Sequence, residues 1–462
     1  MATKYLKKLL FFFLLMLFSS AGIAQEQPNI VFYITDDQSQ RDAGIYGAEV
    51  VETPNMDRLA ARGMTFNRAF IASPACAPSR AALLTGLMPA RNGAEANHTY
   101  PDPDIPLLTE KLQENGYEVI AFGKVAHGPM NEKSNFDYYE PVPKRGDLSG
   151  KVEEYLEENP SDSPRLILVG DHRPHVLWTE KMEYDPENVD LPDYFIDTGE
   201  TREHRARYYT DISGMDRELG EVMDLAQDRF GDNLLFLFSS DHGGQWPFAK
   251  WNLYEAGIKV PVIAAWPGHI EEGSRTNAMV SWIDIFPTLL DLTGGSIPGD
   301  LDGRSFAPVL KGETDSHRDH IFTTHSGDGK FNVYPIRSVR TDRYKYILNL
   351  LPDHYHSNHS DINRYDGAGE YWHSWEKAAK ENPEAEAIYN KYFERPKEEF
   401  YDLQEDPTEQ NNLIDSGQHQ EIISDLRERL QQWMEEQGDR KLIYNAPYPA
   451  CGPKPTRAMI NE

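Results

Sequence analysis

NIVFYITDD, residues 29–37, is an unbroken run of aliphatic, β-branched and aromatic residues that ends in two carboxylates. Strands that are buried on both faces of a parallel sheet have this pattern, whereas a half-exposed strand alternates apolar and polar residues. We therefore predict a buried parallel strand with Asp36 and Asp37 at its carboxyl end.

Three further apolar runs also lead into charged or titratable residues. The run at 117–124 ends in lysine, and the runs at 165–175 and 233–244 lead into Asp and His. Helical patterns at 53–63 and 106–116 alternate with them. This order predicts an α/β fold with a large mixed, mostly parallel sheet flanked by helices. Ligands bind beyond the carboxyl ends of such strands, so the polar strand ends predict a site at that edge.

The chain changes character after about residue 320. YPIRSVRTDRYKYILNL, residues 334–350, alternates polar and apolar residues and predicts an antiparallel pair with a turn near 341–342. Helices are expected at 371–382 and 420–437, and the apolar stripe of the second predicts packing against a core. Between the antiparallel pair and the helix at 371–382, the chain contains His354, His356 and His359. These residues indicate a solvated polar loop, with a second metal site as the alternative.

The first 24 residues have the form of a secretory signal peptide: lysines, an apolar run and small residues up to Ala24. A retained N-terminal anchor is the alternative. No later segment holds the roughly 18 uninterrupted apolar residues that a membrane helix needs. We predict an exported protein, periplasmic or secreted, with a signal peptide at 1–24, a catalytic α/β domain at 25–320 and a C-terminal α+β subdomain at 321–462 that contributes to the substrate cleft.

The formal charge is −29, which opposes binding to nucleic acid and to anionic membranes at long range. A local basic pocket can still bind an anion, because salt screens charges beyond about 10 Å. The composition therefore excludes nucleic acid and anionic membranes as partners, whereas anionic small molecules and glycans remain candidates.

SPACAPSRAALLTG, residues 73–86, contains Cys76, one of only two cysteines. It resembles the type I sulfatases, whose signature is Cys-x-Pro-x-Arg leading into a helix. The resemblance implies that a separate formylglycine-generating enzyme oxidises Cys76 to formylglycine (3-oxoalanine). A thiol that must be converted is unavailable for a bond to Cys451, so we expect no disulfide between the two.

Other blocks of that family are similar to this chain over residues 29–414, and they imply the alkaline-phosphatase-like sulfatase fold. The resemblance implies a metal, Ca²⁺ or Mg²⁺, which suits the hard carboxylate oxygens. The implied metal ligands are Asp36, Asp37, Cys76, Asp241 and His242. The implied catalytic residues are Cys76, Arg80, Lys124, His127, His175 and Lys250.

Sulfate esters resist hydrolysis, so a site needs positive charge on the sulfuryl oxygens, a strong nucleophile and an acid for the leaving group. In the implied mechanism the hydrated formylglycine attacks sulfur and Arg80 steadies it. His175 or Lys250 protonates the leaving oxygen, and His127 then takes the proton whose loss expels sulfate. His98 and His325 are predicted to line the substrate cleft.

Within the family, the chain resembles N-sulfoglucosamine sulfohydrolases, with some features of the iduronate-type sulfatases. We predict a sulfatase that acts on an O-sulfated glycan, with an algal polymer such as ulvan as the specific expectation. The alternatives are a heparan sulfamidase, a formylglycine-dependent phosphonate or phosphate diester hydrolase, and a glycan-binding relic without activity.

Overall fold

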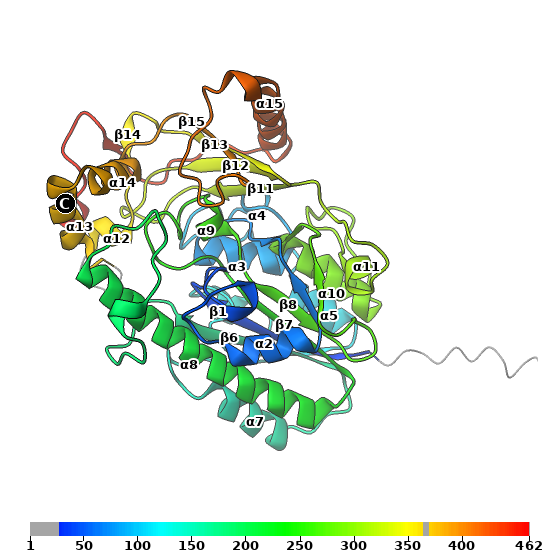
Figure 1. The fold of residues 1–462 in the computed structure, drawn as a ribbon. Coiled ribbons are helices and arrows are strands. Elements are labelled where there is room, and N and C mark those ends of the chain that lie inside the picture. The colour runs from blue at the N-terminus through cyan, green and yellow to red at the C-terminus, as the bar shows by residue number, and fades with distance from the viewer. Residues whose placement is uncertain (1–26, 364–368, 462) are drawn as a thin grey trace, which may run out of the picture.

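The computed structural model describes residues 27–363 and 369–461, so the signal peptide predicted at 1–24 lies outside the described residues. A large sheet runs through the middle of the molecule (Figure 1). It has eight strands in the order β5-β4-β6-β1-β7-β8-β2-β9. Within this sheet only β8 runs opposite to the others. The strands are β1 (Asn29–Asp36), β2 (Met64–Phe66), β4 (Glu118–Gly123), β5 (Tyr138–Glu140), β6 (Arg165–Pro174), β7 (Leu234–Ser240), β8 (Val262–Ala265) and β9 (Ser274–Thr276). The mixed, mostly parallel sheet is therefore confirmed.

Helices cover both faces of this sheet (Figure 1). One face carries α2 (Pro54–Ala61), α7 (Leu148–Glu158) and the long α8 (Gly199–Phe230), and the other carries α3 (Cys76–Thr85), α5 (Leu108–Glu114) and α10 (Ile285–Thr293). Shorter helices join them: α4 (Pro89–Asn92), α6 (Met130–Lys133), α9 (Glu255–Ile258) and α11 (Ala307–Leu310).

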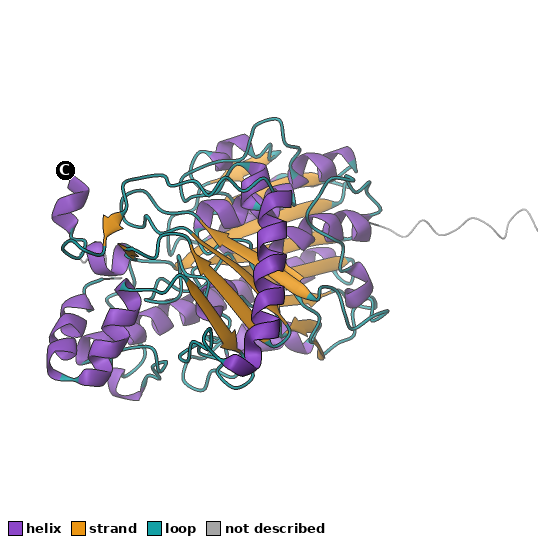
Figure 2. Ribbon diagram, turned by 90° about the horizontal axis from the view of Figure 1, so that it is seen from above, coloured by secondary structure: helices purple, strands orange, loops and turns teal. Residues whose placement is uncertain are grey.

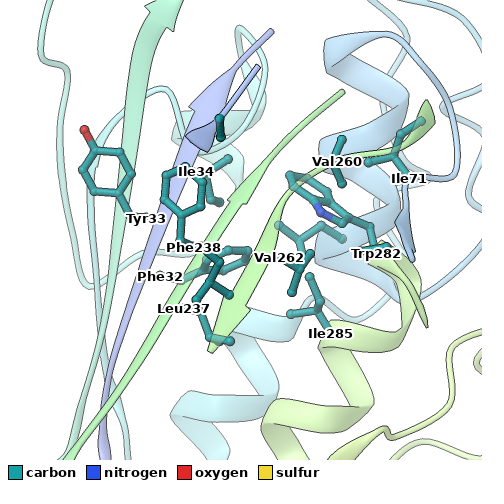
Figure 3. Close-up of a cluster of buried hydrophobic side chains, with 14 of the residues drawn as sticks. Phe32, Tyr33, Ile34, Ile71, Leu237, Phe238, Val260, Val262, Trp282 and Ile285 are labelled. Carbon is teal, nitrogen blue, oxygen red and sulfur yellow. The ribbon is translucent and has the colours of Figure 1, made fainter. Parts of the chain in front are cut away.

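Both faces of β1 are buried, which explains its continuous apolar sequence (Figure 3). On one face the Phe32 ring packs edge-on against Trp282, with 6.3 Å between the ring centroids. On the other face the Tyr33 ring stacks on Phe238, and its hydroxyl donates a 2.7 Å hydrogen bond to Asp171. The central strand thus holds the two helical layers together.

A second, antiparallel sheet follows in the order β11-β12-β13-β15. Its strands are β11 (His320–His325), β12 (Ile336–Thr341), β13 (Tyr344–Asn349) and β15 (Glu398–Asp402). Helix α15 (Gln420–Glu436) packs on it, and its buried residues share a cluster with Ala72 and Ala82 of the first part of the chain. The predicted hairpin and the core-facing stripe are confirmed, although Ile422 of that stripe is only partly buried.

The segment between β13 and β15 contains the helix predicted at 371–382, which is confirmed, together with two helices that the sequence did not predict. Its helices α12 (His359–Ile362), α13 (Trp372–Glu381) and α14 (Pro383–Phe393) form a group at one end of the molecule, near the C-terminus (Figures 1 and 2). Two short pairs, β3 (Ala69–Phe70) with β10 (Val280–Ser281) and β14 (His354–Tyr355) with β16 (Tyr448–Pro449), and helix α16 (Arg457–Asn461) complete the fold. No helix within the described ranges is long and apolar enough to cross a membrane.

Candidate active site

The site lies at the carboxyl edge of the first sheet. Strands β4, β6, β1 and β7 are parallel neighbours in that order, so their carboxyl ends meet at one edge. Lys124 follows β4, His175 follows β6, Asp36 ends β1 and Asp241 follows β7. The structure therefore brings together the polar strand ends that the sequence placed at this edge.

A buried cluster of metal-ligating side chains forms at this edge. Its members each offer one donor atom, and all five atoms lie within 4.8 Å of one another; the members are Asp36, Asp37, Cys76, Asp241 and His242. Asp37 has a φ of 72°, in the left-handed region that non-glycine residues seldom occupy. Backbone strain of this kind persists where the surroundings enforce it, as is common at active sites.

Cys76 is the first residue of α3 and is 2% exposed. Its Sγ lies 3.3 Å from His242 Nε2 and 3.5 Å from Lys124 Nζ. Burial raises the pKa of this thiol, but Lys124, Lys250 and His242 together bring it well below its usual value. Cys76 and Cys451 are both free, so the expected absence of a disulfide between them is confirmed.

Three basic side chains compensate the carboxylates: Arg80 and Lys250 are buried, and Lys124 is partly buried. Lys124 Nζ lies 2.5 Å from Asp36 Oδ2, and Lys250 Nζ lies 2.9 Å from both oxygens of Asp37. Arg80 Nε donates to Asp241 Oδ2 at 2.9 Å, and its Nη1 donates to the Lys124 and Val125 carbonyls. Each of the three carboxylates thus forms an ion pair with a basic side chain inside the same cluster.

The donor set fits a hard divalent cation. Burial raises the pKa of Asp241 to about 7 despite Arg80, so this carboxylate gains if further positive charge is placed beside it. His242, whose Nε2 lies 3.4 Å from Asp37 Oδ1, has its pKa raised to about 9 because Asp241 and Cys76 outweigh the effect of burial. Carboxylate oxygens are the ligands that Ca²⁺ and Mg²⁺ prefer.

Two histidines meet beside Cys76. His127 Nε2 lies 3.0 Å from His98 Nδ1, and burial lowers the pKa of His127 although the Cys76 thiol partly offsets that effect. His175 is 30% exposed, with Nε2 4.0 Å from Asp37 Oδ2. The predicted His98, His127 and His175 therefore all lie at the cluster.

His325, predicted to line the substrate cleft, is a buried residue in this structure. It is fully buried at the end of β11, and its Nε2 lies 3.0 Å from Asn332 Oδ1. Burial lowers its pKa to about 4, so it is neutral. Its contact with substrate stays a prediction.

The loop histidines do not form a solvated loop, so that prediction is wrong. His356 is fully buried, and burial lowers its pKa well below the usual value. His359 stacks between Trp251 and Phe331, with ring centroids 4.9 and 3.9 Å away. Within residues 27–363 and 369–461, the clustered metal-ligating side chains are the five at Cys76, so nothing there supports the alternative of a second metal site.

Two residues at the site escaped the sequence analysis. Asp328 is 2% exposed and accepts hydrogen bonds from Asn97 and Trp251, which come from distant segments. Lys144 bonds to the carbonyls of His175 and Leu177 and holds the His175 loop in place. The one sequence signal for Asp328 is its position in a Gly-rich loop just beyond a strand, and this pattern is common.

Comparison with known families identifies the class of protein. The Sulfatase family profile matches residues 28–296, and the profile of the C-terminal region of N-sulphoglucosamine sulphohydrolase matches residues 242–366. The chain therefore belongs to the sulfatase family and is an enzyme that hydrolyses sulfate esters.

A curated relative and two solved structures are similar to this chain. The chain is 34% identical to an "Ulvan-active sulfatase" of Formosa agariphila over 439 residues, which cover 92% of this chain and 83% of that protein. Its fold resembles the solved structure of a protein in complex with its substrate, D-glucosamine-2-N,6-O-disulfate (TM-score 0.69, 19% identity, covering 90% of this chain and 99% of that chain). It also resembles a phosphonate monoester hydrolase from Silicibacter pomeroyi (TM-score 0.68, 19% identity, 90% and 97%). At such identities these two structures establish the fold alone.

Proposed function

We propose that this protein is an exported sulfatase that removes O-sulfate from oligosaccharides of an algal polysaccharide such as ulvan. The observation that carries the proposal is the position of Cys76, buried at the start of α3 among three carboxylates and three basic side chains. The 34% identity to an ulvan-active sulfatase over 92% of the chain supports the choice of glycan. The signal-like N-terminus supports export to the periplasm or beyond.

Two groups complete the proposed site. Asp36, Asp37, Asp241 and His242 would hold Ca²⁺, with Mg²⁺ as the alternative, and the cation would supply positive charge that favours an ionised oxygen at position 76. A formylglycine-generating enzyme would convert Cys76, which would supply a hydrated aldehyde as the nucleophile. Both groups fit a cluster that is buried, rich in oxygen donors and lined with cations.

The chain's own side chains perform the remaining tasks. Lys124, Lys250 and the amino end of α3 bind the sulfuryl oxygens, because positive charge in a dry site stabilises developing anions. His175 donates the proton to the leaving oxygen, since it is the more exposed of the two candidate acids and Lys250 is held by Asp37. Arg80 steadies position 76 through Asp241, and His127 accepts a proton from that position.

Sulfate release from a substrate panel tests the proposal. Protein matured with a formylglycine-generating enzyme would be assayed on ulvan oligosaccharides, on 2-O- and 6-O-sulfated heparin disaccharides and on N-sulfated glucosamine, with Cys76→Ala as the blank. We expect release from an O-sulfated algal oligosaccharide and none from the blank. Release from the N-sulfated sugar alone would instead establish the sulfamidase alternative, which the match to the N-sulphoglucosamine sulphohydrolase C-terminal region favours.

The phosphonate hydrolase alternative is tested in the same assay. It rests on the structural likeness to a phosphonate monoester hydrolase, which shows the fold alone. A phosphonate monoester and a phosphate diester would be added to the panel. Turnover of these at a higher kcat/KM than every sulfated sugar, with the aldehyde confirmed by mass, would overturn the proposed function.

A further inference from the structure

The ring of His175 is held by a backbone group of its own loop. Its Nδ1 lies 2.6 Å from the carbonyl oxygen of Val176, and a carbonyl oxygen can only accept, so Nδ1 donates this hydrogen bond. Nε2, on the other side of the ring, faces Asp37 Oδ2 at 4.0 Å. The direction of the Val176 carbonyl therefore determines which way Nε2 points.

Lys144 binds the carbonyl groups on both sides of that of Val176. Its Nζ donates to the oxygen of His175 and, at 2.5 Å, to the oxygen of Leu177. Arg145 Nη2 donates to the same Leu177 oxygen at 2.9 Å. The two peptide groups that flank the Val176 carbonyl are thus fixed by side chains from a different segment, which lies between β5 and α7.

Packing contributes little to this stretch, residues 175–177, which we call the His175 loop. Its first and last side chains are 30% and 57% exposed, although the middle one packs against the core. The loop is anchored at its ends, because the buried Trp178 indole donates to the Pro174 carbonyl at 2.7 Å. Segments with few buried apolar contacts open at little cost in free energy, so the bonds from Lys144 matter here.

A buried carboxylate on α8 holds Lys144 in turn. Asp211 is 2% exposed, and its Oδ2 lies 3.3 Å from Lys144 Nζ. Arg145 pairs with the same carboxylate through Nε at 2.9 Å and Nη2 at 2.6 Å. Arg145 has a φ of 61°, in the left-handed region that non-glycine residues seldom occupy, and the turn that it forms brings both basic side chains to Asp211. The ammonium group is therefore fixed without any substrate.

We infer that Lys144 is a positioning residue for His175: it fixes the His175 loop and so aims Nε2 of the ring at the carboxylate cluster. In the described part of the chain, Lys144 contacts Asp211 and the two loop carbonyls and pairs with no member of that cluster, so it acts through the loop. The inference rests on the proposed function for the task of His175 as the acid, but the orientation of the ring depends on no substrate.

Crystal structures of protein that keeps cysteine at position 76 test the orientation. Lys144→Met removes the ammonium group and keeps the length of the side chain, Lys144→Arg keeps the charge, and Lys181→Met makes the same change at an exposed lysine. In Lys144→Met alone, we expect the His175 ring to turn or its loop to shift by more than about 0.5 Å, the tolerance of a productive site. An unchanged loop and ring in Lys144→Met would overturn the inference.

Kinetics of the matured enzyme separate a positioning role from a purely structural one. Misplacement of a catalytic group by about 1 Å costs about 10²-fold, so we expect Lys144→Met to lower kcat by about that factor with KM within about threefold. Lys144→Arg should recover most of this loss, and Lys181→Met should equal wild type. A higher KM with an unchanged kcat would make Lys144 a substrate contact and contradict the positioning role.

A double-mutant cycle shows whether Lys144 acts through His175. Residues that act as a unit are not additive, so we expect Lys144→Met to lower kcat by less than about threefold when it is added to His175→Ala. The residual rate of His175→Ala is measured at high enzyme concentration. A further loss as large as that in the wild-type background would refute action through the ring. Because the crystal structures need no turnover, an enzyme that is inactive on the whole substrate panel would contradict the proposed function and leave this inference to be decided by them.

Discussion

Arg80 shows how much of the site depends on one buried side chain. It is fully buried and bonds to Asp241, with Asp36 at 3.4 Å, and it also donates to two carbonyl groups next to β4. Removal of one partner from a buried ion pair leaves an uncompensated charge, which costs about 3–5 kcal/mol. A lysine keeps the charge but loses the planar fork of donors.

We therefore expect Arg80→Gln to lower the free energy of unfolding by about 3 kcal/mol and Arg80→Lys by less. Urea unfolding measured by circular dichroism compares the three proteins. Both variants should also lose most sulfate release, because Asp241 and position 76 are no longer held in place. Equal stability of Arg80→Gln and wild type would show that Asp241 finds another partner.

At the scale of elements, Asp284 connects α10 to the start of the second sheet. Its carboxylate accepts from Ser281 N and Arg304 N and pairs with Arg318, which precedes β11. Burial alone would raise the pKa of Asp284, but Arg318 and His317 lower it to about 2. A carboxylate with a lowered folded pKa stabilises the protein above its unfolded pKa, and that contribution is lost as the pH falls through the folded value.

The stabilisation by Asp284 should thus be complete above about pH 5 and disappear toward pH 2, with a size of about 2 kcal/mol for a shift of this extent. The measurement is urea unfolding of wild type and Asp284→Asn at pH 7, 4 and 3. The difference in free energy of unfolding between them should shrink as the pH falls. A difference that stays constant with pH would assign the role of Asp284 to packing alone.

The close contact between the end of α2 and the first sheet requires a residue without a side chain at position 63. A Cβ at Gly63 would lie 2.1 Å from the carbonyl oxygen of Ala264 on β8, so the backbone there must shift. At Gly199, the first residue of α8, a Cβ would meet nothing within 4 Å. We expect Gly63→Ala to destabilise the protein by about 1–3 kcal/mol and Gly199→Ala to leave it unchanged or slightly more stable. Thermal unfolding of the pair checks this, and equal melting temperatures would contradict it.

For the whole molecule, the elements that could be predicted are those whose burial shows in the pattern of neighbouring residues. Strands β1, β4, β6 and β7 are buried on both faces and so appear as apolar runs with polar ends. The 32-residue α8 was not predicted, because it buries polar residues such as Arg205 that pair with side chains far along the chain. The positions of Asp328 and His356 depend in the same way on distant partners, which no local pattern can indicate.

The residues of the site could be predicted because they follow strand ends or belong to a specific motif. Because they come from distant segments, a bound ion should stabilise the whole molecule. Elements from β1, α3 and β7 meet at the carboxylate cluster, so an ion bound there links segments 204 residues apart, as the pair Asp37 and Asp241 shows. A ligand that binds only the folded state stabilises it by about 2.7 kcal/mol at a concentration 100 times its Kd. We expect a chelator to lower the melting temperature of the wild-type protein and added Ca²⁺ to restore it.

Two variants make this measurement specific. Asp37→Asn removes one negative charge from the donor set and should greatly reduce the difference between chelator and Ca²⁺, whereas Asp319→Asn removes an exposed carboxylate outside the cluster and should keep it. Scanning calorimetry in the two buffers records all three proteins. A wild-type melting temperature that is the same in chelator and in Ca²⁺ or Mg²⁺ would mean that Arg80, Lys124 and Lys250 alone compensate the carboxylates, and the metal would have to be removed from the proposed mechanism.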